Sequence, residues 1–252
     1  MASHIVSSYD ADLQDLRRLI SEMGGIAEKM MAEAGEALVR RDPALAAAVI
    51  AQDRRLDELQ REIEERAILL IARRQPLAID LREAISAIRV ASDVERIGDL
   101  AKNVAKRVAA IADQYQPQRV VLGLQRMSDL AQAQLKDVLD AYAAQDERAA
   151  RDVWERDGQI DALHTSLFRE LLTDMMEDPR NITFCTHLLF CAKNVERIGD
   201  HTTNIAETIH YLVTGETLPA DRPKDDRSTE AVVPGPLPGP MPGAAEMAGG
   251  SV

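Results

Sequence analysis

The sequence Val94-Glu95-Arg96-Ile97-Gly98-Asp99 occurs twice, and all six residues are identical at positions 195–200. In each copy an asparagine, Asn103 or Asn204, follows the aspartate after four residues. A repeat of this length, with its two copies 101 residues apart, indicates an internal duplication. The chain is therefore expected to contain two copies of one structural unit.

The acidic residues of this motif have helical spacing. Glu95, Asp99 and Asn103 are four residues apart, so on an α-helix they form one stripe. The apolar residues of the same segment fall on a different face, which is expected to point into a core; they are Val94, Ile97, Ala101, Val104 and Val108. The second copy repeats this arrangement with Glu196 and Asp200. The acids are therefore expected on the surface of a helical bundle.

A glycine, Gly98 or Gly199, lies in the middle of each predicted helix. Glycine at such a position costs about 1 kcal/mol relative to alanine. Something in the fold must offset this cost. We expect a neighbouring backbone to approach closely at the glycine.

Composition points to an all-α protein. Only 3% of the 252 residues are aromatic, and period-two alternation is rare. The net charge of -12 argues against binding to nucleic acid and favours cations or basic protein surfaces. The sequence shows neither a signal peptide nor a membrane-spanning run, so we expect a cytoplasmic protein that does not insert into the membrane. Cys185 and Cys191 match no disulfide or zinc spacing.

The apolar pattern divides each half into three helices with short connections. Asp42-Pro43 and Asp146 are expected to begin the middle helices, the second of which is expected to continue to Asp178-Pro179. The resulting organisation is a flexible N-terminus at 1–9, three-helix bundles at 10–115 and 116–215, and a disordered Pro/Gly-rich tail at 216–252. The two bundles are expected to pack end to end or side by side.

A second acidic pattern, Asp-x-x-x-Asp, lies in each middle helix. It comprises Asp53 and Asp57 in the first half and Asp157 and Asp161 in the second. Each half thus supplies two acidic pairs on adjacent helices. If these helices approach each other, four carboxylates meet in one patch.

Such a patch favours a bound cation. Two like charges about 4 Å apart repel by about 4 kcal/mol at an effective dielectric constant of 20. Carboxylate oxygens suit Mg²⁺, Mn²⁺, Ca²⁺ or iron, whereas zinc usually recruits His or Cys. The alternative is a solvated face on which Arg96 and Arg197 neutralise the acids. His164, three residues after Asp161, is expected to be a polar surface residue. The other histidines considered, His187, His201 and His210, are expected to be surface or packing residues.

These features resemble the PhoU family of phosphate-signalling proteins. The resemblance rests on the duplicated Glu-Arg-Ile-Gly-Asp, the Asp-x-x-x-Asp pairs and the sequence Gln-Pro-Leu-Ala-Ile-Asp-Leu-Arg at 75–82, and it covers about residues 10–214. It implies two three-helix bundles, frequent dimerisation and metal clusters on the acidic motifs. The implied ligands are Asp53, Asp57, Glu95, Asp99, Asp157, Asp161, Glu196 and Asp200. Asp93 has Asn194 as its counterpart, so the two sites are expected to differ.

The resemblance also implies a function. It predicts a negative regulator of phosphate uptake, acting as a non-enzymatic adaptor between the ATPase subunit of the phosphate ABC transporter and a sensor histidine kinase. The alternatives are a metal-free helical scaffold and a di-iron, ferritin-like protein. The di-iron alternative is disfavoured because its ligands face the core of a bundle, whereas the acidic pairs here are expected to face outward. Its sites also use Glu-x-x-His, and the only related motif expected here is Asp161-x-x-His164.

Overall fold

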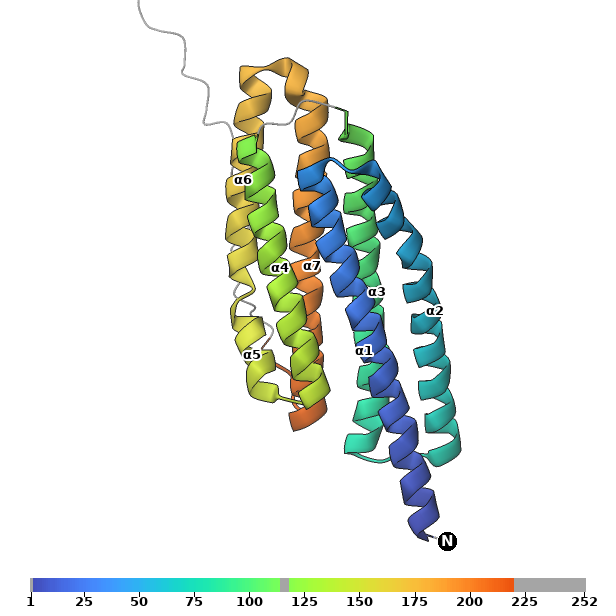
Figure 1. Cartoon of the computed structure of the whole chain (residues 1–252). Coiled ribbons are helices and arrows are strands. Elements are labelled where there is room, and N and C mark those ends of the chain that lie inside the picture. The colour runs from blue at the N-terminus through green and yellow to red at the C-terminus, as the bar shows by residue number, and fades with distance from the viewer. Residues whose placement is uncertain (1, 114–117, 220–252) are drawn as a thin grey trace, which may run out of the picture.

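The computed structural model describes residues 2–113 and 118–219, which form seven α-helices and one 3-10 turn (Figure 1). The helices are α1 (Ala2–Arg40), α2 (Pro43–Arg74), α3 (Ile79–Ile111), α4 (Gln118–Ala144), α5 (Glu147–Glu155), α6 (Gly158–Glu177) and α7 (Ile182–Thr214), with the 3-10 turn η1 (Pro179–Asn181) before α7. The all-α fold class is confirmed. Helix α1 starts at Ala2, earlier than the sequence pattern predicts. From residue 220 onward, the predicted tail lies outside the described residues.

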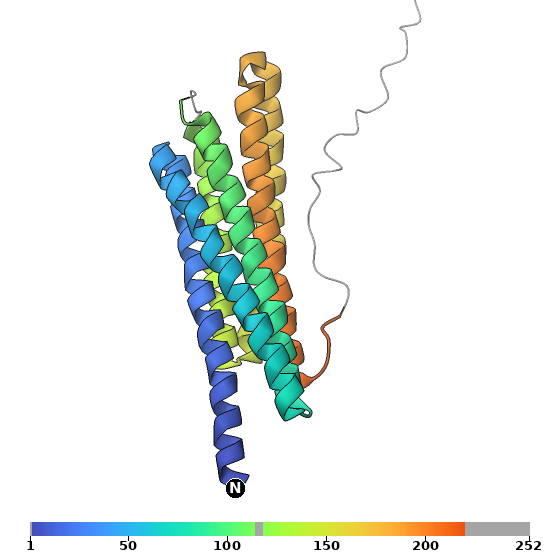
Figure 2. The same ribbon diagram turned by 90° about the vertical axis from the view of Figure 1, so that its right-hand side faces the viewer.

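The helices form two bundles that lie side by side. Repeat one comprises α1, α2 and α3, and repeat two comprises α4, the stacked pair α5 and α6, and α7. The long helices α3 and α7 pack against each other in opposite directions, while α1 packs against α4 (Figures 1 and 2). Their contacts join the two repeats into one continuous hydrophobic core. Both motif helices therefore lie at the centre of the molecule.

The duplication is visible in how the middle helices begin. Asp42 accepts hydrogen bonds from the backbone N–H groups of Ala44 and Leu45, and Asp146 does the same at the start of α5. The residue before each cap has a positive φ, 55° at Arg41 and 51° at Gln145. An N-terminal cap of this kind contributes about 1 kcal/mol. The same turn therefore connects the first two helices of both repeats.

The middle helix of repeat two is interrupted, unlike α2. The break falls at Arg156 and Asp157, where the sequence was expected to remain helical. Buried Gln134 of α4 donates a hydrogen bond to the backbone carbonyl of Arg156 (3.1 Å), which ties that carbonyl to a neighbouring helix. Gly158 follows at once, and an Asp-Gly pair is a known turn signal. This interruption places Asp157 at a helix junction.

The motif glycines do allow close packing, but the neighbour is a side chain and not a backbone. A Cβ atom at Gly98 would collide with the Cδ1 atom of Leu56 on α2. At Gly199 it would lie 2.8 Å from the Cδ1 atom of Ile160 on α6. In both repeats the glycine thus accommodates an apolar side chain of the middle helix, and this packing brings the two acidic pairs together.

Candidate functional site

The four acids of repeat one meet between α2 and α3. Asp53 and Asp57 come from α2, and Glu95 and Asp99 come from α3; all four are half-buried. Burial raises the pKa of Glu95, and the negative charges of Asp99, Asp57 and Asp53 raise it further, while Arg96 opposes the shift. The predicted clustering of the first two acidic pairs is therefore present in the structure.

A lysine lies inside this cluster. The Nζ atom of Lys102 is 2.6 Å from Asp53 Oδ2 and 2.5 Å from Asp99 Oδ1. Burial alone would lower the pKa of Lys102, but its hydrogen bonds to the two aspartates outweigh burial and raise the pKa. Arg96 lies farther out, with nitrogens 3.7 Å from Glu95 and 3.7 Å from Asp99. The main countercharge in repeat one is thus the ammonium group of Lys102.

The acids of repeat two are more deeply buried. Asp157, Asp161 and Glu196 are buried, and Asp200 is partly exposed, so the expectation of surface acids is wrong for this repeat. Burial raises the pKa of Glu196; Lys193 opposes this shift, while Asp200 and Asp161 add to it. The Nζ atom of Lys193 is 2.8 Å from Glu196 Oε2. Desolvation is therefore the largest influence on the pKa of Glu196.

Thr203 occupies the position in repeat two that Lys102 occupies in repeat one. Both follow the aspartate of the motif by three residues. The hydroxyl of Thr203 donates a hydrogen bond to Asp157 Oδ1 at 2.8 Å, just as Lys102 bonds to Asp53. The geometry is conserved between the repeats, whereas the charge is not.

The eight carboxylates have suitable donor chemistry for a hard cation, but their arrangement does not form a ready metal site. Within residues 2–113 and 118–219, no three His, Cys, Asp or Glu side chains converge closely enough to hold a metal ion. In repeat one, the Lys102 ammonium lies between Asp53 and Asp99. The geometry of the cluster therefore does not fit a metal there, and metal binding stays a prediction.

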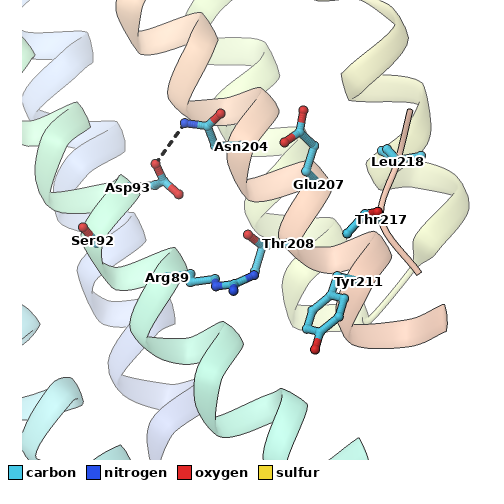
Figure 3. Close-up of a pocket in the computed structure, with 9 residues that line it drawn as sticks. All are labelled: Arg89, Ser92, Asp93, Asn204, Glu207, Thr208, Tyr211, Thr217 and Leu218. Carbon is cyan, nitrogen blue, oxygen red and sulfur yellow. Dashed lines mark hydrogen bonds between the residues drawn. The ribbon is translucent and has the colours of Figure 1, made fainter. Parts of the chain in front are cut away.

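Asp93 connects the two repeats, a role that the sequence pattern did not reveal. Its Oδ1 atom lies 2.8 Å from His201 Nδ1. The same atom accepts a hydrogen bond from the Asn204 amide at 3.3 Å (Figure 3). Asn204 was expected to extend the acidic stripe, but it reaches across to α3. The counterpart of Asp93 in repeat two is Asn194. This difference between the repeats was the sequence signal that Asp93 has a role of its own.

A polar cavity of about 380 Å³ adjoins this contact between α3 and α7. Its lining residues, shown in Figure 3, are Arg89, Ser92, Asp93, Asn204, Glu207, Thr208, Tyr211, Thr217 and Leu218. The guanidinium carbon of Arg89 lies 5.5 Å from the centre of the Tyr211 ring. At the other end of the same helix pair, Arg107 lies closer to Phe190, at 4.0 Å. An arginine of α3 therefore lies over an aromatic ring of α7 at each end of the interface between the repeats.

His164 differs from its expected setting, whereas His210 is one of the packing residues that the sequence allowed. His164 is buried, with its ring 6.4 Å from that of Phe168, and is not a surface residue. His210 is also buried. With Glu207 it forms a Glu-x-x-His sequence of the type found in di-iron proteins, so the expectation that Asp161-x-x-His164 is the only related motif is wrong. The Nδ1 atom of His210 lies 2.7 Å from Glu147, whereas Glu207 accepts a hydrogen bond from Trp154. The two side chains have separate partners, so this motif does not form a di-iron ligand pair.

The chain matches the model of the PhoU domain at residues 20–108 and 124–209. It is 57% identical over 227 residues to the phosphate-specific transport system accessory protein PhoU homolog of Rhizobium meliloti (strain 1021), covering 90% of this chain and 96% of that protein. The corresponding protein of Caulobacter vibrioides (strain NA1000 / CB15N) is 51% identical over 226 residues, covering 90% and 98%.

Solved structures agree with these sequence relationships. The crystal structure of PhoU from Pseudomonas aeruginosa has a TM-score of 0.80 and 37% identity, covering 82% of this chain and 100% of that chain. The regulatory protein PhoU of the phosphate transport system from Streptococcus pneumoniae has a TM-score of 0.78 and 29% identity, covering 84% and 99%. Among the described residues of the present chain, no helix is long and apolar enough to cross a membrane.

Proposed function

The chain belongs to the PhoU domain family, and on this premise we propose that it is a regulatory accessory protein of a phosphate transport system. It acts as a non-enzymatic adaptor that restrains phosphate uptake and phosphate-starvation signalling when phosphate is plentiful. The observation that carries this proposal is the match over nearly the whole length of relatives named as transport system accessory proteins.

An adaptor needs separate surfaces for its partners, and the fold offers two. The turns that follow α2 and α6 lie at opposite ends of the molecule (Figure 1). Leu77 beside the first turn is 80% exposed, and Met176 beside the second is 84% exposed. We assign the partners as the ATPase subunit of the transporter and a sensor histidine kinase. A cytoplasmic location and a homodimeric state are parts of the same proposal.

Deletion of the gene tests the regulatory function directly. In phosphate-rich medium, the deletion strain is expected to take up labelled phosphate faster than wild type and to express phosphate-starvation genes. Complementation with the full chain should restore repression. Unchanged uptake and expression in the deletion strain would contradict the proposal.

A capture experiment tests the adaptor mechanism. Tagged full-length protein from phosphate-fed cells should retain the transporter ATPase subunit and the kinase. Leu77→Glu and Met176→Glu place a charge on one exposed end each, so each variant is expected to lose one partner more than the other. Two variants that keep both partners would exclude these ends as docking surfaces.

Metal binding belongs to the proposal for repeat two, where Asp157, Asp161, Glu196 and Asp200 supply oxygen donors suited to Mg²⁺, Mn²⁺ or iron. To hold an ion, at least three of these side chains have to move closer together than they lie in the structure. The alternative, a metal-free scaffold, is favoured by the Lys102 ammonium in repeat one. The metal content of protein purified without a chelator distinguishes the metal site from the metal-free scaffold. A Glu196→Gln variant with the same metal content as wild type would favour the scaffold.

A further inference from the structure

We propose that Lys102 is a built-in cation that takes the place of a divalent metal ion in repeat one. Repeat one then needs no added ion, and metal binding is confined to repeat two. This inference rests on the metal component of the proposed function, but it makes a separate statement about repeat one. The difference on which the inference rests lies three positions after the motif aspartate, where repeat one has Lys102 and repeat two has Thr203.

The contacts of Lys102 are those that a bridging cation would make. Its ammonium group joins Asp53 of α2 to Asp99 of α3, at 2.6 Å and 2.5 Å. Its side chain is only 18% exposed. It therefore links the two acidic helices across their interface and offsets part of the repulsion among the four carboxylates.

A metal ion cannot share this position with the ammonium. Oxygen ligands bind Mg²⁺ at about 2.0–2.1 Å and Ca²⁺ at about 2.3–2.6 Å. An ion bonded to the same oxygens of Asp53 and Asp99 would lie within contact distance of the Nζ atom, with positive charge on both. Lys102 would first have to leave and give up two charge-assisted hydrogen bonds. The lysine therefore excludes the ion by both space and charge.

Repeat two provides a natural comparison at the matched position. Thr203 reaches Asp157 through a hydrogen bond of 2.8 Å, but its hydroxyl brings no charge. The lysine of that repeat, Lys193, approaches Glu196 from the preceding turn and is 47% exposed. Its head group can move into water without leaving a buried position. The second cluster can thus exchange its countercharge for a metal ion more easily than the first.

The test exchanges the two matched residues in the full-length protein. Wild type, Lys102→Thr and Thr203→Lys are stripped with a chelator and titrated with Mn²⁺, with bound ion measured by calorimetry and electron paramagnetic resonance. Lys102→Thr is expected to bind one more Mn²⁺ per chain than wild type, and Thr203→Lys to lose the ion bound in repeat two. Lys106→Thr, which removes an exposed lysine one turn farther along α3, is the matched control and should behave as wild type.

Thermal unfolding gives a second readout. In chelator, Lys102→Thr should melt at a lower temperature than wild type, and Mn²⁺ should restore much of the difference. Lys102→Arg keeps the charge and should neither gain an ion nor respond to Mn²⁺ more than wild type. Circular dichroism identifies any variant that fails to fold. If Lys102→Thr fails to fold, Lys102→Met replaces it.

The outcomes separate this inference from the proposed metal site. If neither Lys102→Thr nor Lys102→Met gains an ion, or if Asp53→Asn removes an ion from wild type, the built-in cation is excluded. If wild type binds no Mn²⁺ but Lys102→Thr gains an ion, the metal site of repeat two fails while the role of Lys102 stands.

Discussion

Repeat one and repeat two present the same four acidic positions but hold them in different surroundings. In repeat one, α2 is continuous, the acids are half-buried and Lys102 lies among them. In repeat two, the middle helix is broken at Asp157, and three of the four acids are buried. Duplicated motifs therefore fix where the acids converge, whereas the residues around the motifs determine their charge balance.

The shared feature, a glycine that faces the middle helix, gives the largest expected effect. Gly98→Leu would force a side chain into the space filled by Leu56, and it should lower the free energy of unfolding by about 3 kcal/mol or more. Gly199→Leu meets Ile160 and should have a similar effect in repeat two. Urea unfolding followed by circular dichroism measures both.

An exposed position on the same helix provides the control for this comparison. Arg96→Leu changes a residue next to the motif acids but outside the core, so the change in stability should stay within about 0.5 kcal/mol. Gly98→Leu with the stability of wild type would show that α2 and α3 do not pack tightly at the glycine.

The helix break in repeat two gives the next largest effect. Gln134 corresponds to Met30 of repeat one, counted from the caps Asp146 and Asp42, and both side chains are fully buried. Gln134→Met removes the donor to the Arg156 carbonyl and should cost about 1–2 kcal/mol. Met30→Gln buries an amide near Gly98 of α3 and should cost about 2–3 kcal/mol.

Hydrogen exchange locates these effects. Gln134→Met should speed exchange of the amides around Arg156 and Asp157, while amides of α2 keep their wild-type rates. Faster exchange throughout the chain would indicate global destabilisation. It would contradict the view that Gln134 acts locally on the helix break.

Much of this fold follows from sequence pattern alone. The three-four spacing of apolar residues, the aspartate caps and the repeated motif predict the helices and the convergence of Asp53, Asp57, Glu95 and Asp99. Such features depend on local periodicity and on short-range capping, which a single sequence displays. The all-α class that these patterns predict is confirmed, and so is the family resemblance, which rests on the repeated motif.

The missed features depend on contacts between distant helices. The bond from Gln134 of α4 to Arg156 reaches the break that follows α5, and the bonds of Asp93 join α3 to α7. No helical wheel shows these contacts, although three local signals existed: Asp157-Gly158, the change from Asp93 to Asn194 and the change from Lys102 to Thr203. Differences between aligned repeats are therefore as informative as their identities.

The smallest expected effect concerns pH and involves Glu147 at the start of α5, in repeat two. Hydrogen bonds from Arg151 and His210 lower the pKa of Glu147 below its ordinary value of 4.5. Because the pKa in the folded state lies below that in the unfolded state, Glu147 contributes stability above pH 4.5 that is lost as the pH falls through the folded-state pKa. The corresponding residue of repeat one is Pro43, which cannot titrate.

Glu147→Gln removes this titration. The variant should melt below wild type at neutral pH, and the difference between their melting temperatures should narrow as the pH falls from about 5 to about 3. Pro43→Ala, at the matched position of repeat one, should shift the melting temperature by a constant amount over the same range. A difference between Glu147→Gln and wild type that does not change with pH would mean that Glu147 stabilises the start of α5 through its hydrogen bonds alone, independent of its charge.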